Sequence, residues 1–96
     1  MTMGSIRRIL QAQHDALERG VLSLWTVYDH PNDFPDCCFV ARRWEVGKDK
    51  SGLPRATNET IIANDLEALR HIFTRAGLHR LPRHDDDDAK IVETWL

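Results

Sequence analysis

The hydrophobic positions of the chain recur at helical spacing in two segments. In residues 6–19 they fall on one side of a helix, and charged side chains fall largely on the other. In residues 64–76 the apolar stripe is clearer still. Gly20 follows the first segment and Gly77 the second, and glycine is a common residue just past a helix end. The pattern therefore predicts two amphipathic helices, which at this length need a surface to pack on.

Both predicted helices have a candidate N-cap. Ser5 precedes the first helix, and its hydroxyl can accept a hydrogen bond from a free amide of the first turn. Asn64 and Glu67 have the spacing of a capping box at the start of the second, although that box normally begins with Ser or Thr. We therefore expect the first helix to begin just after Ser5 and the second to begin at Asn64.

The other apolar runs are typical of strands. Residues 21–29 and 37–46 are rich in β-branched and aromatic side chains, with apolar residues on both faces. This favours a sheet with one face covered by helix and the other partly covered. Pro82 is expected to stop a short strand, because proline lacks the N–H that a sheet needs. Shorter strands are expected at 58–63, 78–81 and 90–96.

The order of these elements predicts the fold class. Short connections between the early strands favour antiparallel pairing. We expect an α+β two-layer sandwich, with a small, mainly antiparallel sheet of four or five strands and helix 64–76 packed on it. The N-terminal amphipathic helix either joins that layer or reaches to another subunit. The expected organisation is an N-terminal helical arm at 1–20 and a single α+β domain at 21–96.

Composition and charge narrow the function classes. The chain has 96 residues, 42% of them hydrophobic, and a net charge of −2, so no global field draws it to nucleic acid or to an anionic membrane. We see neither a signal peptide nor an apolar run long enough to span a membrane, and we expect a cytoplasmic protein. The adjacent Cys37 and Cys38 are expected to be reduced thiols.

The turn between the first two strands gathers possible metal ligands. Asp29, His30, Asp33 and Asp36 lie within eight residues, and Cys37 follows them. Their spacing matches no zinc or EF-hand pattern, so ordinary turn chemistry is the favoured interpretation and a metal-dependent enzyme an alternative. We assign no metal site, no cofactor and no catalytic residue. The dyad of His30 with a neighbouring cysteine lacks an orienting partner.

A second polar run follows His84. Asp85–Asp88 would suit weak divalent-ion binding or an acidic partner surface, but runs of like charge are more often solvated turns that protect a neighbouring strand from edge pairing. Trp95, near the last residue, is expected to dock in the core of its own chain.

Arginines occur in clumps along the chain, and aromatic residues lie on or between the predicted strands. Arg42, Arg43, Trp44, Tyr28 and Phe34 are the candidate partner-binding residues. Such a set can clamp and stack single-stranded nucleic acid, but no RNP-type signature is present and the charge balance is not basic. Packing in the core is the other interpretation of these aromatic residues.

Two stretches resemble known proteins. Residues 25–36 spell W-T-V-Y-D-H-P-N-D-F-P-D, and the end of the chain has Leu-Pro-Arg, an acidic run and a strand with Glu-Thr-Trp. Over residues 25–96 the chain resembles a group of small uncharacterised bacterial proteins. The resemblance implies no activity and transfers no catalytic residue. It implies that the helix at 6–19 is an addition to the group's common domain.

Taken together, the sequence predicts a small non-catalytic protein-interaction module with an unknown protein partner. It would act as a regulator or inhibitor of another bacterial or phage protein, and a homodimer is among the expected arrangements. A single-stranded nucleic-acid binder using Arg42, Arg43 and nearby aromatic residues is one alternative. A metal-dependent enzyme at the Asp/His turn is the other.

Overall fold

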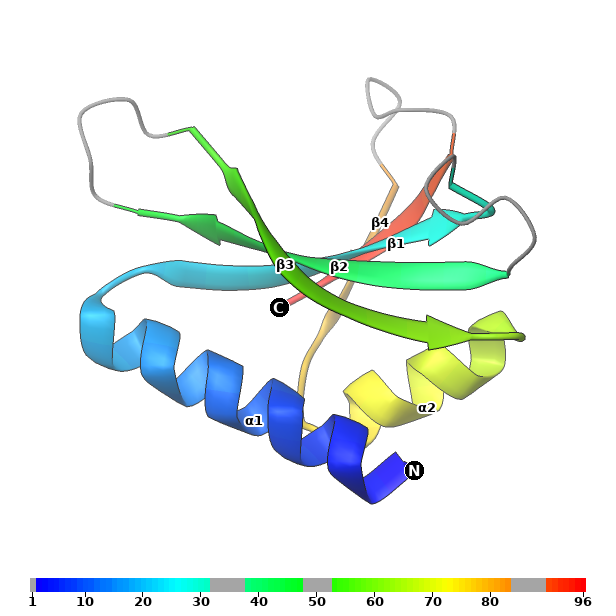
Figure 1. The fold of residues 1–96 in the computed structure, drawn as a ribbon, viewed down its shortest axis with the longest axis horizontal. Coiled ribbons are helices and arrows are strands. Elements are labelled where there is room, and N and C mark those ends of the chain that lie inside the picture. The colour runs from blue at the N-terminus through cyan, green and yellow to red at the C-terminus, as the bar shows by residue number, and fades with distance from the viewer. Residues whose placement is uncertain (1, 32–37, 48–52, 84–89) are drawn as a thin grey trace.

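The computed structural model describes residues 2–31, 38–47, 53–83 and 90–96. Five strands form one antiparallel sheet in the order β3-β2-β1-β5-β4, and both helices lie on one face of it (Figure 1). The predicted α+β architecture is confirmed, and of the two places expected for the N-terminal helix the structure has the layer on the sheet. The elements are α1 (Thr2–Arg19), β1 (Leu22–Asp29), β2 (Phe39–Val46), β3 (Arg55–Ala63), α2 (Leu66–Arg75), β4 (Arg80–Pro82) and β5 (Ile91–Trp95).

Both helices end as predicted, at a glycine. Gly20 and Gly77 have φ angles of 72° and 84°, which glycine adopts without the steric penalty of a Cβ atom. Each glycine N–H donates to the carbonyl three residues earlier, and the next residue's N–H donates to the carbonyl five residues before it. These paired bonds satisfy carbonyls that the helix end would otherwise leave free, and they turn the chain into the following segment.

The predicted helix starts were wrong. α1 begins at Thr2, so Ser5 lies inside the helix and is not its N-cap. The N-cap of α2 is Asp65, whose carboxylate accepts a hydrogen bond of 2.8 Å from the backbone N–H of Glu67. Asp65 has the extended backbone angles of an N-cap, and its side chain accepts from a free amide of the first turn. Asp65, and not Asn64, is therefore the N-cap.

Two strand boundaries also differ from expectation. β3 begins at Arg55 and not at residue 58, and its register with β2 shifts between Arg42 and Trp44. The polar side chains at the start of β3 concealed this part of the strand. β4 consists of Arg80–Pro82 and not of residues 78–81, so the strand ends at Pro82 but includes the proline as its last residue. β4 is an edge strand, and the unpaired side of an edge accepts a residue without an N–H.

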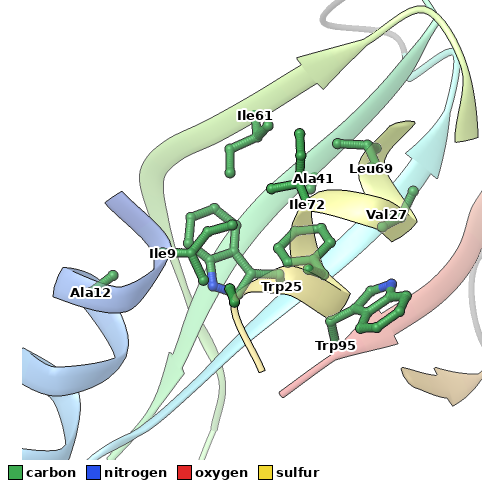
Figure 2. Packing of buried hydrophobic residues seen from close by; sticks show 11 residues of the cluster. Ile9, Ala12, Trp25, Val27, Ala41, Ile61, Leu69, Ile72 and Trp95 are labelled. Atoms are coloured by element: carbon green, nitrogen blue, oxygen red, sulfur yellow. The ribbon is translucent and has the colours of Figure 1, made fainter. Parts of the chain in front are cut away.

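The core lies between the helices and the sheet (Figure 2). Phe73 of α2 packs between two tryptophans, with ring centroids 5.7 Å from Trp25 and 5.5 Å from Trp95. Trp95 is 5% exposed, which confirms that it docks in its own core. Ile9 of α1 is fully buried in the same cluster, so α1 is part of the packing.

Candidate interaction face

Strand alternation divides the side chains of the sheet between a face that the helices cover and a face turned away from them. Trp25, Val27 and Ala41 belong to the core and define the helix-covered face. Residues paired directly across neighbouring strands point to the same side. The register of the strands therefore assigns every paired residue to one face.

The helix-covered face carries buried charges. Arg43, 7% exposed, lies opposite Trp25 and donates from Nε to Glu59 at 2.8 Å and from Nη1 to Glu45 at 2.8 Å. Arg19 from the end of α1 donates to the same Glu45 carboxylate. This network ties α1, β2 and β3 together.

The charges of this network stabilise one another. The hydrogen bond from Arg19 is the largest cause that lowers the pKa of Glu45, to about 2, and the bond and charge of Arg43 act in the same direction. The pKa of Arg19 is raised in turn, chiefly by its hydrogen bond to Glu45. The carboxylate is therefore ionised throughout the neutral range and leaves no proton for acid–base chemistry there.

A second buried carboxylate sits under α2. Glu93 is 2% exposed and accepts hydrogen bonds from the Arg70 guanidinium and from the Trp95 indole N–H, the latter at 2.9 Å. The hydrogen bond to Glu93 is the main cause that raises the pKa of Arg70. Like the first network, this one has its partners satisfied inside the protein and joins a helix to the sheet.

The face turned away from both helices, which we call the open face, has the opposite composition. In the part of the chain that the structure describes, Arg42 is the only charged side chain in its paired rows. The row of Thr26 is rich in threonine. The mainly apolar rows of Leu24 and Leu22 lie on one side of it, and the mainly apolar row of Tyr28 lies on the other. The rows across the sheet are Ile62, Val40, Tyr28 and Ile91; Thr60, Arg42, Thr26, Thr94 and Leu81; Ala56, Trp44 and Leu24; and Val46 and Leu22.

Exposure on the open face rises from the middle to the margins. Val40 and Thr26 in the middle are buried, whereas Leu22, Ile62 and Leu81 at the margins are about half exposed. Trp44 is half-buried, and its indole N–H is buried with no acceptor among the described residues. A buried donor without a partner lowers stability, so this N–H is an unfavourable feature of the open face.

The structure separates the five candidate partner-binding residues. Tyr28, Arg42 and Trp44 share the open face. Arg43 does not belong with them, because it points to the other face and is held in the buried ion-pair network. Phe34 lies outside the described residues.

Sequence reasoning missed the aliphatic part of this face. Leu22, Leu24 and Val46 extend the surface around Trp44. Their positions follow from strict alternation within residues 22–28 and 40–46, counted from the buried Trp25. The alternation was concealed because both faces of these strands are apolar.

The Asp/His turn is only partly described. The imidazole of His30 contacts the carboxylate of Asp29, and both side chains are more than half exposed. Asp33, Asp36 and Cys37 lie outside the described residues, as do His84 and Asp85–Asp88. Among the residues that are described, no three His, Cys, Asp or Glu side chains gather where they could hold a metal ion.

The expectation of reduced thiols was wrong for Cys38, which is disulfide-bonded in the structure. The strand pattern had suggested that neighbouring cysteines point to opposite faces. Cys38, however, precedes β2 and has a φ angle of 148°, so it does not follow the strand geometry on which that expectation depended.

A groove of about 760 Å³ lies between the start of α1, the end of β3 and α2. Its lining is mainly aliphatic, with Ile61, Ala63 and Ile72 among its residues, and Arg8 is the one charged residue of this lining. The Arg8 guanidinium donates to the backbone carbonyl of Thr60 at 3.1 Å. The described lining therefore brings together no acid, base and nucleophile for a reaction.

No protein-family model, curated protein or solved structure matches the chain. The resemblance to small bacterial proteins therefore stays a prediction. In the described residues, neither helix is long and apolar enough to cross a membrane.

Proposed function

We propose that this chain is a small non-catalytic interaction module, cytoplasmic, that binds a protein partner through the open face. The supporting observation is that the charged side chains of the sheet lie mainly on its helix-covered face, and the open face is largely apolar. The face under the helices holds Arg43, Glu45 and Glu93 in ion pairs, whereas Arg42 is the one charge in the described rows of the open face. A sheet face that meets only water usually carries the polar residues, and extended apolar surface is typical of binding sites.

The composition of the open face suits a protein partner. Aromatic residues and arginine are enriched at protein interfaces, and charged residues are depleted at their centres. Tyr28, Arg42 and Trp44 supply the first group, and Leu22, Leu24 and Val46 surround them with aliphatic surface. A regulator or inhibitor of another protein acts by covering a surface, and this role needs no reactive group.

A photo-crosslinking experiment tests the proposal. The photo-reactive residue p-benzoylphenylalanine replaces Leu22 on the open face or, as the matched control, Leu10 on α1, which are 47% and 49% exposed. In cells that express the full chain, we expect a discrete crosslinked protein from position 22 and none from position 10. Equal or absent crosslinking at the two positions would overturn the proposal.

Single-stranded nucleic acid is a second candidate ligand, favoured by the shared placement of Tyr28, Arg42 and Trp44. Aromatic rings that accept stacked bases beside a guanidinium form such a site. The Arg42 Nη1 atom already donates to the Thr57 carbonyl at 3.1 Å, which holds the guanidinium against the sheet. Fluorescence anisotropy with short DNA and RNA oligomers at low salt decides this alternative, and we expect no binding.

A further inference from the structure

We infer that the occupant of the open face is a second copy of this chain, packed sheet to sheet. The inference rests on the proposed function and names its partner. The resulting dimer would have two sheets in the middle and the helices of each copy on the outside (Figure 1). Sheets packed face to face in this way are a common architecture, with mean strand directions within about 30° of each other.

The charge pattern of the open face is compatible with a copy of itself. In a twofold interface the same patch meets itself, so a strongly charged patch would repel its copy. The described rows hold one charge, Arg42, which already donates to Thr57 on the neighbouring strand. The Arg42 side chain therefore does not require a carboxylate from a different protein.

The position of Arg42 also avoids a clash of like charges. β1 is the middle strand of the sheet, with β2 on one side of it and β5 on the other. Thr26 of β1 lies between Arg42 and Thr94 in one row. A twofold axis along β1 would place each Arg42 over Thr94 of the partner subunit, and the two guanidinium groups would lie on opposite sides of the axis.

The same axis places apolar rows on apolar rows. In the row of Tyr28, β2 of each copy would lie over β5 of the other copy. Tyr28 and Ile91, which are half-buried, supply the contact there, because Val40 is already buried within its own chain. Obligate homodimer interfaces are more apolar than other interfaces and resemble a domain core cut in half.

The size of the face suits a dimer as well. The sheet has five strands, and β1 and β2 have eight residues each. β3 has nine residues, but β5 has five and β4 three, so with strands about 4.8 Å apart and about 3.4 Å per residue the footprint is roughly 540 Å². This is below the ~800 Å² per partner of a standard interface and falls in the range of weaker complexes, which agrees with a dimer that dissociates on dilution.

Sedimentation equilibrium of the full chain over a range of concentrations tests the inference. We expect a dimer that dissociates on dilution. Leu22→Glu should raise the dissociation constant at least tenfold, because it buries a carboxylate at the interface. The matched change Leu10→Glu, at nearly the same exposure on α1, should leave it unchanged.

Circular dichroism establishes that both variants are folded. If Leu22→Glu does not give the wild-type spectrum, Val46→Glu, at the position paired with Leu22, replaces it. A wild-type chain that stays monomeric up to several hundred micromolar would overturn the inference, and so would equal effects at positions 22 and 10.

The outcome is separable from that of the crosslinking experiment. If the chain is monomeric but position 22 captures a different protein, the interaction module stands and the second copy is excluded. If the captured protein is the chain itself, both proposals are supported. A monomeric chain that captures nothing overturns both.

Discussion

At the scale of single residues, the buried charges decide much of the stability. Glu45 is 7% exposed and accepts from Arg19 and Arg43. A buried carboxylate is tolerated only when such partners replace its hydration. Removing one partner leaves a charge without compensation, whereas removing the carboxylate's charge leaves two guanidinium groups close together. The network is therefore sensitive to changes at each of these positions.

Stability should fall at low pH because of Glu45. Its pKa is about 2 in the folded protein against an ordinary value of 4.5. A lowered pKa gives stability that is complete above the unfolded value and is lost as the pH falls from about 4.5 to about 2. Glu45→Gln should lower the free energy of unfolding at pH 7 by roughly 2–3 kcal/mol and flatten this part of the pH profile.

Urea unfolding at fixed protein concentration, repeated between pH 2 and pH 7, measures the effect of Glu45→Gln. Glu67→Gln is the matched control, because the Glu67 side chain is 76% exposed and pairs only at the surface of α2 in the contact with Arg70. An unchanged slope of stability against pH in the Glu45→Gln variant would contradict the assignment.

At the scale of elements, α1 is held by one narrow stripe of small and aliphatic residues. Ile9, Ala12 and Ala16 are buried, and Leu10 and Leu17 on the neighbouring flank are exposed. The Gln13 amide adds polar contacts, because it accepts from the Trp25 indole and donates to the Ser23 carbonyl. The helix therefore contributes both core packing and specific hydrogen bonds to β1.

Two neighbouring substitutions test how firmly α1 belongs to the core. Ile9→Ala should destabilise the protein by about 2–5 kcal/mol, because it leaves a cavity beside Trp25 in a fully buried position. Leu10→Ala, one residue further along, should change stability by no more than about 0.5 kcal/mol. Urea denaturation measures both, and equal small effects would indicate a separable arm.

The start of α2 offers a similar paired test. Asp65→Ala should cost about 1 kcal/mol, because it removes the carboxylate that accepts from the Glu67 amide. Asn64→Ala should cost less, since the structure gives the capping role to its neighbour. Thermal unfolding of the two variants, with the helical signal as readout, distinguishes them. A larger loss at Asn64 would restore the position that the sequence pattern had suggested.

The sequence predicted the features that depend on one residue or its neighbours, and it did not predict those that depend on pairing between distant strands. Gly20 and Gly77 mark helix ends because the required backbone conformation belongs to one residue. Alternation along a strand already puts Arg43 and Trp44 on opposite faces, but assigning each of them to a face needed the register that pairs Arg43 with the buried Trp25. Adjacent arginines look alike in a sequence, and only the pairing of strands decides which of them is buried.

At the scale of the whole molecule, the first strand in the sequence, β1, pairs with the last, β5. β5 pairs with β1 on one side and β4 on the other, and Trp95 of β5 completes the aromatic stack on Phe73. Pairing between segments this far apart in the sequence requires the closure of a long loop, and folds that depend on such pairing fold more slowly.

The place of β5 has a consequence during synthesis on the ribosome. Until residues 91–95 have emerged from the exit tunnel, β1, β2 and β3 can pair with one another, but the strand between β1 and β4 is missing. Trp25 and Phe73 then have no Trp95 to pack on, and one edge of β1 has no partner. An unfinished sheet edge beside exposed aromatic rings is a surface that chaperones bind and that promotes aggregation. The sheet is therefore completed only when β5 pairs between β1 and β4.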